Sequence, residues 1–120
     1  MECQETESRI QQEIVKHYRN NYCLAHHSPR CLIMSIPNDA ARTRATQYAQ
    51  TGMYTGAADL LIMHWAAGGK LRTIFAETKT DKGRLDPAQV RFRDHVLSMG
   101  LEYYVLRSVE DLKSIVNNGI

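Results

Sequence analysis

The chain has 120 residues, 43% of them hydrophobic and 23% charged, and its 15 Lys and Arg against 13 Asp and Glu give a formal net charge of +2. This length provides one hydrophobic core, so we expect a single domain over residues 1–120. No apolar run approaches the about 20 residues of a membrane span, and the polar, acidic N-terminus is unlike a signal peptide, which predicts a cytoplasmic protein.

Apolar residues recur in two patterns along the chain. Near the N-terminus, Ile10, Ile14 and Tyr18 recur at the spacing of one helix face. Later apolar runs are short and bounded by Gly, Pro or polar residues, as strands are. In chain order we predict a helix at about 5–20, a strand at 31–36, a polar loop at 38–57 with a short helix at about 44–50, strands at 59–65 and 74–79, a helix at about 87–99, a strand at 101–106 and a helix from 108 to about 117.

Local signals mark the ends of these elements. Pro37 stops the first strand, and Gly68-Gly69 is typical of a hairpin connection. Asp86-Pro87-Ala88-Gln89 has the residues of an N-cap, a first-turn proline and a capping box. The strand at 101–106 is apolar on both faces, so we expect helices on both. The sequence therefore predicts an α/β fold with a central mixed β-sheet flanked by helices.

The cysteines indicate a reducing compartment. Cys3, Cys23 and Cys31 are odd in number and irregularly spaced, so we expect free thiols and no disulfide. Cys23 and Cys31 do stand near His26 and His27, and all four are residue types that bind zinc. Their spacing matches no paired-ligand pattern, and a buried thiol at the start of a strand is the simpler interpretation of Cys31.

Two carboxylates and a lysine stand where a core would prefer Val or Ile. Asp59 opens one strand of the hairpin, and Glu77 and Lys79 share one face of the other because strand side chains alternate. Two carboxylates that converge from neighbouring strands suit Mg²⁺, which prefers oxygen ligands. Lys79 would then hold the attacking water or stabilise charge on a phosphoryl oxygen. In the competing interpretation, Glu77 and Lys79 form a solvated pair on an edge strand.

Glu7 and Gln89 each allow two interpretations. Glu7 extends the core-facing helix stripe, which would bring a carboxylate to the site, but an acid in the first helical turn is also favoured by the helix dipole. Gln89 is explained by capping alone, although a helix that starts just after the Glu77 strand also brings it back over the site. The sequence leaves both questions open.

Basic residues flank these carboxylates. Arg42 and Arg44 lie in the long polar loop, and Lys82 and Arg84 follow the Glu77 strand. Each of them alone is typical of a solvated surface, whereas the set favours a polyanionic substrate whose phosphates it would contact. The chain has no Ser-His-Asp spacing and no Gly-rich phosphate loop, so nucleophilic or nucleotide-dependent chemistry has no support.

An ordered set of these motifs resembles a known family. Residues 52–59, Glu77-Thr78-Lys79, residues 82–85 and Gln89 are similar to the virus-type replication-repair nuclease (VRR-NUC) domain of the PD-(D/E)xK nuclease superfamily. The resemblance runs from Glu7 to the final helix and implies a restriction-endonuclease-like core. The family usually has Pro where this chain has Ala58, a departure that concerns the backbone and not a ligand.

The resemblance also implies an activity. It predicts a DNA endonuclease that depends on Mg²⁺ or Mn²⁺, with Asp59, Glu77 and the backbone carbonyl of Thr78 as ligands, Lys79 acting on water, and Glu7 and Gln89 in support.

Stand-alone proteins of this kind look like dimeric, structure-selective nucleases, with four-way (Holliday) junctions as the leading substrate and DNA repair as the setting, in a bacterial or phage-infected cell. One site per chain and two cuts per junction suggest a homodimer. The competing functions are a non-catalytic DNA-binding or assembly module, a flap or nicking nuclease, and a restriction-type endonuclease. Intact Asp59, Glu77 and Lys79 argue against the first.

Overall fold

The computed structural model describes residues 6–23, 31–37, 52, 54–66 and 68–118. Its elements are α1 (Glu7–Tyr18), a π-helical turn η1 (Arg19–Cys23), β1 (Cys31–Ser35), β2 (Leu60–Trp65), β3 (Leu71–Thr78), α3 (Pro87–Ser98), β4 (Glu102–Leu106) and α4 (Val109–Asn118). Each predicted helix and strand within the described residues is present, with ends shifted by up to three residues. The short helix predicted at 44–50 lies outside them.

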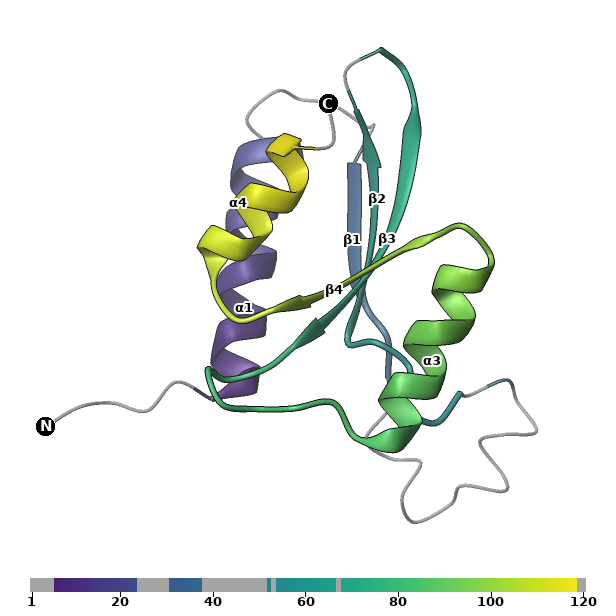
Figure 1. Cartoon of the computed structure of the whole chain (residues 1–120). Coiled ribbons are helices and arrows are strands. Elements are labelled where there is room, and N and C mark those ends of the chain that lie inside the picture. The colour runs from purple at the N-terminus through teal and green to yellow at the C-terminus, as the bar shows by residue number, and fades with distance from the viewer. Residues whose placement is uncertain (1–5, 24–30, 38–51, 53, 67, 119–120) are drawn as a thin grey trace, which may run out of the picture.

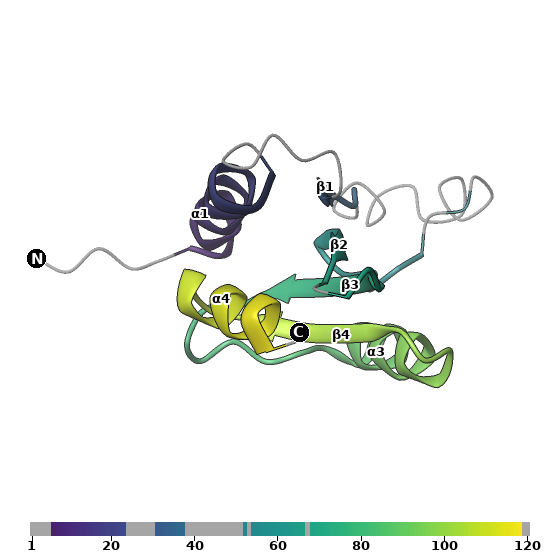
Figure 2. The same cartoon turned by 90° about the horizontal axis from the view of Figure 1, so that it is seen from above.

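The four strands form one mixed sheet in the order β1-β2-β3-β4. β1 pairs with β2, and β2 with β3, in antiparallel fashion, whereas β3 and β4 are parallel and joined through α3. α1 and α4 lie on one face of the sheet and α3 on the other (Figures 1 and 2). This arrangement confirms the predicted fold class.

The larger core lies between the sheet and the helices α1 and α4. α1 begins directly after Thr6, whose side chain caps it by accepting a hydrogen bond from the Arg9 backbone N–H at 3.1 Å. Ile10, Ile14 and Tyr18 form its buried stripe, as predicted. They pack with buried residues of the sheet and of α4, among them Ile33, Leu60, Ile62, Ile74, Leu106, Leu112 and Val116.

A second core lies under α3 and holds the chain that enters β2. Phe92 and Val96 of α3 pack on Tyr103 of β4 and on the segment just before Asp59. In that segment Gly56 has φ +88°, and a Cβ there would stand 2.5 Å from the Ala88 backbone. Only glycine allows this approach, so the sequence at Gly56 fixes the distance between the start of β2 and the first turn of α3.

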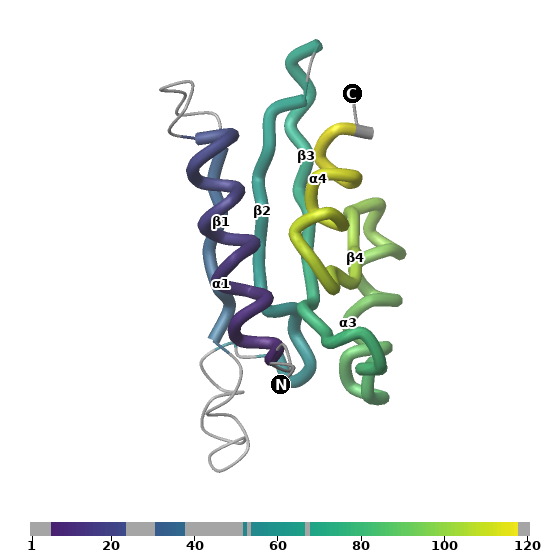
Figure 3. Tube along the Cα trace, turned by 90° about the vertical axis from the view of Figure 1, so that its left-hand side faces the viewer, coloured from purple at the N-terminus to yellow at the C-terminus, as the bar shows by residue number. Residues whose placement is uncertain are grey.

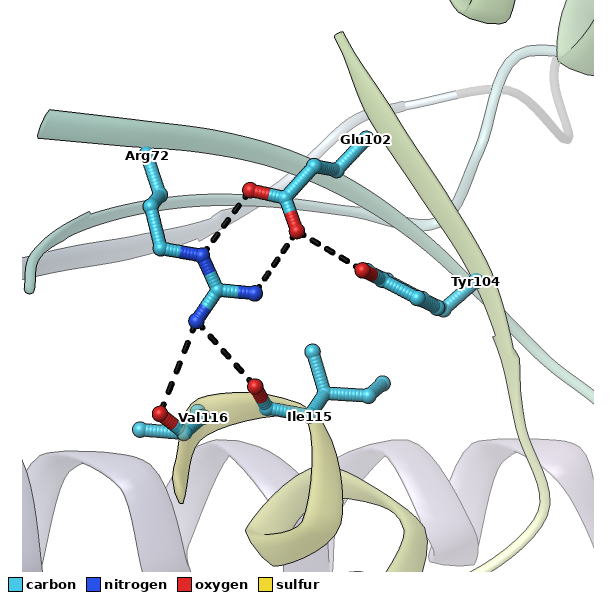
Figure 4. Close-up of polar contacts among 5 residues, drawn as sticks. All are labelled: Arg72, Glu102, Tyr104, Ile115 and Val116. Atoms are coloured by element: carbon cyan, nitrogen blue, oxygen red, sulfur yellow. Dashed lines mark hydrogen bonds and ion pairs between the residues drawn. The ribbon is translucent and has the colours of Figure 1, made fainter. Parts of the chain in front are cut away.

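At the opposite end of β3, a buried ion pair joins the sheet to α4. Arg72, which is 7% exposed, donates to both carboxylate oxygens of Glu102 at 2.9 and 2.6 Å, and Tyr104 donates to the same carboxylate (Figure 4). The guanidinium also donates to the carbonyls of Ile115 and Val116 near the end of α4. β4 therefore contacts α3 on one face and α4 on the other, as its sequence predicted.

The prediction that no disulfide forms is wrong for one pair of cysteines. The structure pairs Cys23 with Cys31, whose Cα atoms lie 5.5 Å apart, a separation typical of disulfides. The reason is that η1 ends beside the first residue of β1, which the spacing in the sequence did not reveal. His26 and His27 of the zinc hypothesis lie outside the described residues.

Candidate active site

The candidate site lies where β2 begins and β3 ends. In the antiparallel register Leu60 faces Ala76. Asp59 directly precedes Leu60 and Glu77 directly follows Ala76, so the two acids are neighbours across the strands. Asp59 Oδ2 accepts hydrogen bonds from the backbone N–H and the hydroxyl of Thr78, at 2.9 and 2.8 Å. Both bonds hold the Asp59 carboxylate at the end of β3. This edge of the sheet lies beside the first turn of α1 (Figure 1).

Glu77 is the buried acid of the pair. It is 2% exposed, and its Oε1 accepts a hydrogen bond from Gln89 Nε2 at 3.1 Å. Its Oε2 is buried and has no hydrogen-bond partner within the described part of the chain. Burial, and then the neighbouring Asp59 carboxylate, raise the pKa of Glu77 to about 9, against the smaller opposing effect of the Lys79 charge. Without a cation, the protonated form of Glu77 is therefore favoured at neutral pH.

Gln89 makes both of the contacts that its sequence allowed. Its backbone N–H donates to Asp86 Oδ1 and its side-chain oxygen accepts from the Asp86 backbone N–H, both at 2.9 Å, which completes the capping box. Its remaining amide group is the donor to Glu77. The helix cap therefore orients the amide that holds the carboxylate.

Lys79 follows β3 and is 8% exposed. Its charge lies close enough to lower the pKa of Glu77, although it forms no ion pair within 4.0 Å with a described carboxylate. A Cβ at Gly83 would lie 3.3 Å from the Lys79 Cδ, so the turn after β3 covers this side chain closely. Lys79 is thus a little-exposed ammonium whose charge acts on Glu77.

Arg107 fixes that turn and was not identified from the sequence. Its Nη1 donates to the carbonyls of Thr80, Asp81 and Gly83, directly after β4 ends. Parallel neighbouring strands end at the same edge of a sheet, so a basic residue just beyond β4 was a usable signal. Lys82 and Arg84 are exposed on this same segment, whereas Arg42 and Arg44 lie outside the described residues.

Glu7 lies at the rim of the site. It is exposed, and it lines a cleft of about 790 Å³ together with Asp59 and Thr78. Its negative charge contributes to the raised pKa of Glu77. The structure thus brings Glu7 into the neighbourhood of the carboxylate pair, as the helix stripe suggested.

Tyr103 is a second residue that the sequence did not single out. It is buried, its hydroxyl has no partner among the described residues, and it pairs in register with Phe75, two residues before Glu77. Burial first, and then the charges of Glu77 and Asp59, raise its pKa. Its aromatic ring in an apolar strand predicted packing alone, and only the structure reveals the polar atom near the site.

The donor set fits a hard divalent cation. Among the described residues no three His, Cys, Asp or Glu side chains converge as a metal cluster, so the oxygen atoms that could hold an ion here are those of Asp59, Glu77 and the backbone. Glu77 Oε2, which has no partner in the described part of the chain, lies beside a second carboxylate, and a cation would satisfy this arrangement. Few protein oxygens with room for water suit Mg²⁺ better than Zn²⁺, which takes N and S ligands in closed sites.

The sheet, its flanking helices and this edge site define an α/β restriction-endonuclease-like fold. Two solved structures share it over nearly their whole lengths. One, described as a VRR_NUC domain protein, is 17% identical with a TM-score of 0.71, and the match covers 98% of this chain and 89% of the other.

The second structure, described as a VRR_NUC domain, is 20% identical with a TM-score of 0.60, and the match covers 92% and 94%. The chain therefore has the fold of VRR-NUC domains. No protein-family model matches the sequence, and no curated protein is detectably similar to it. None of the described helices has the length and apolar character needed to cross a membrane.

Proposed function

We propose that this protein is a divalent-metal-dependent endonuclease that hydrolyses phosphodiester bonds in branched DNA. The observation that supports the proposal best is the buried Glu77 carboxylate, which has one oxygen without a partner among the described residues and lies beside Asp59 at the end of two paired strands. Burying an acid beside a second acid costs folding free energy, and acids with perturbed pKa values concentrate at functional sites. The fold shared with VRR_NUC domains agrees with this proposal.

Asp59, Glu77 and the backbone carbonyl of Thr78 would hold Mg²⁺ or Mn²⁺ through oxygen atoms. A bound ion of this type polarises a phosphoryl oxygen and lowers the pKa of a coordinated water. The Thr78 hydroxyl and N–H keep Asp59 in place, and Gln89 does the same for Glu77. The chain therefore orients both carboxylates before the ion arrives.

Lys79 and Glu7 complete the site from two sides. The Lys79 ammonium, little exposed and not engaged in an ion pair with a described carboxylate, stabilises negative charge at the scissile phosphate or orients the attacking water. Glu7 approaches from α1 and supports the water or the ion from the cleft side. These roles leave Lys82, Arg84, Arg42 and Arg44 to bind the DNA backbone, which accounts for basic residues around an acidic site.

Four-way junctions are the proposed substrate, and a homodimer is the proposed assembly. One chain contributes one pair of carboxylates, and the resolution of a junction needs two symmetric cuts, which a two-fold dimer supplies. Sedimentation at micromolar concentration with and without junction DNA measures this directly. A monomer in both states would instead favour a nicking or flap nuclease.

A cleavage panel tests the activity. Duplex, single-stranded, flap and junction DNA are incubated with Mg²⁺ or Mn²⁺, and we expect the strongest cutting of branched substrates. Asp59→Ala and Glu77→Ala should abolish cleavage and retain DNA binding, whereas Glu110→Ala, a control that removes an exposed acid on α4, should cut like the unaltered protein. A wild-type protein that binds DNA but never cuts would identify a non-catalytic module. Strong preference between two unrelated junction sequences would identify a restriction-type enzyme.

A further inference from the structure

A cleft between α1 and β1 opens from the candidate site and is larger than the metal chemistry needs. Its volume is about 790 Å³, towards the upper end of the about 300–1,000 Å³ typical of binding pockets. Glu7, Asp59 and Thr78 line one end, and Lys16 and Arg19 line the other. Figure 3 shows α1 running along β1.

α1 and the following turn η1 form one wall of the cleft, on which every lining residue except Val15 is polar or charged. Its lining residues recur every four positions in two adjacent rows, so they form one face of the helix beside the buried apolar stripe. Between the acidic and basic ends this face presents neutral side chains, including the amide of Gln11. Amide groups donate and accept hydrogen bonds, which suits the edges of unpaired bases.

The charges along the cleft have a direction. Glu7 and Asp59 stand at the end where a cation would sit, and Lys16 and Arg19 stand about 14 and about 18 Å further along the helix axis. Neither basic residue forms an ion pair within 4.0 Å with a described carboxylate, so both have charge available for phosphates. At about 3.4 Å per stacked nucleotide this length corresponds to at most about five nucleotides.

We infer that this cleft binds an unpaired DNA strand that continues from the scissile phosphate, with Lys16 and Arg19 contacting its phosphates. The inference rests on the proposed nuclease function and specifies its substrate as DNA with a single-stranded segment beside the cut. A duplex is the poorer match, because it brings two phosphate backbones to a cleft whose basic side chains stand at one end only. A single strand matches the volume of the cleft, and its phosphates would meet the basic residues at the end away from the cation.

Binding measured in chelator tests the cleft without any cleavage. The probes are a fluorescently labelled blunt duplex and the same duplex with a single-stranded tail of about five nucleotides, attached in turn by its 5′ or its 3′ end. The double variant Lys16→Gln/Arg19→Gln removes both cleft charges. The matched control Lys70→Gln/Lys113→Gln removes one exposed and one half-buried charge outside the cleft, and circular dichroism checks that all proteins are folded.

We expect one tailed probe to bind the unaltered protein at least about tenfold more tightly than the blunt duplex. The cleft variant should lose that gain, while its affinity for the blunt duplex stays within about twofold of the control. Its slope of log affinity against log salt on the tailed probe should fall by about 1.4, the value for two phosphate contacts on a single strand. Equal losses on both probes, or none on either, would overturn the inference.

The nuclease proposal fails on a different result. If the wild-type protein shows tail-dependent binding but never cuts in Mg²⁺ or Mn²⁺, the cleft binds a strand in a non-catalytic protein. If it cuts but no tail improves binding, the activity stands and the cleft has no role in substrate choice.

Discussion

Glu77→Gln tests two effects of the buried carboxylate, its cost to folding stability and its proposed binding of a metal ion. Glutamine has the shape of a protonated glutamate and retains an oxygen that can accept the hydrogen bond from Gln89. It cannot ionise, and it binds a hard cation poorly. The substitution therefore removes the charge and leaves the packing in place.

The magnitude follows from the pKa of Glu77, raised from 4.5 to about 9 in the folded protein. A raised pKa means that the folded protein keeps a proton that the unfolded chain has lost. The stability that comes from this retained proton is complete below pH 4.5 and is lost as the pH rises towards 9. The metal-free protein should lose up to about 1.4 kcal/mol per pH unit in this window, or up to about 3 kcal/mol between pH 6 and 8.

Urea unfolding of both proteins in EDTA at pH 6 and pH 8 measures this effect. The wild-type protein should be less stable at pH 8, the Gln variant should lose most of that dependence, and at pH 8 the variant should be the more stable protein. Saturating Mn²⁺ should reverse the order, because the ion replaces the proton and stabilises only the chain that binds it. Equal pH dependence in the two proteins, or equal stabilisation by Mn²⁺, would refute the reasoning.

Three further predictions concern other residues. Lys79→Ala should keep metal affinity and lose turnover by roughly 10²-fold, the scale for one preorganised electrostatic group; a parallel loss of metal affinity by calorimetry would make Lys79 structural. Arg72→Ala leaves Glu102 without its bidentate partner and should destabilise the fold by about 3 kcal/mol in urea, with Mn²⁺ affinity unchanged because Arg72 lies at the far end of β3. Burial and then Arg72 lower the pKa of His64, so its neutral form stabilises the fold above pH about 6.5 and this contribution is lost on acidification. His64→Gln should reduce the loss of stability between pH 7 and 5, measured by urea unfolding. An unchanged loss would contradict the lowered pKa of His64.

The fold was predictable because its signals are local and agree with one another. The helical spacing of Ile10, Ile14 and Tyr18 gave α1 and its buried face, and the residues from Asp86 to Gln89 gave the start of α3. The ends were less accurate where the signal was a single side chain. Thr6 caps α1 closer to its apolar stripe than the sequence indicated, and the contact of Cys23 with Cys31 depends on a π-helical turn that has no clear sequence pattern.

The site was predictable only where strand geometry determines it. Asp59 and Glu77 lie together because one hairpin fixes their register, which a sequence with a clear turn signal specifies. Arg107 and Tyr103 reach the site from β4, and their positions depend on the parallel pairing of β3 with β4 through α3. That pairing brings together residues more than twenty positions apart. The sequence around Tyr103 and Arg107 predicts only a strand and gives no sign of a site.

The two interpretations of Gln89 illustrate why the sequence alone could not choose. A capping glutamine uses its oxygen towards the Asp86 backbone, which leaves the amide N–H₂ group free to point elsewhere. In this fold α3 starts over the end of β3, so the free donor meets Glu77 Oε1 at 3.1 Å. One side chain thus couples the start of a helix to the orientation of a candidate metal ligand. The other carboxylate oxygen is buried and has no partner among the described residues, so it is the atom that would contact a cation in the proposed nuclease.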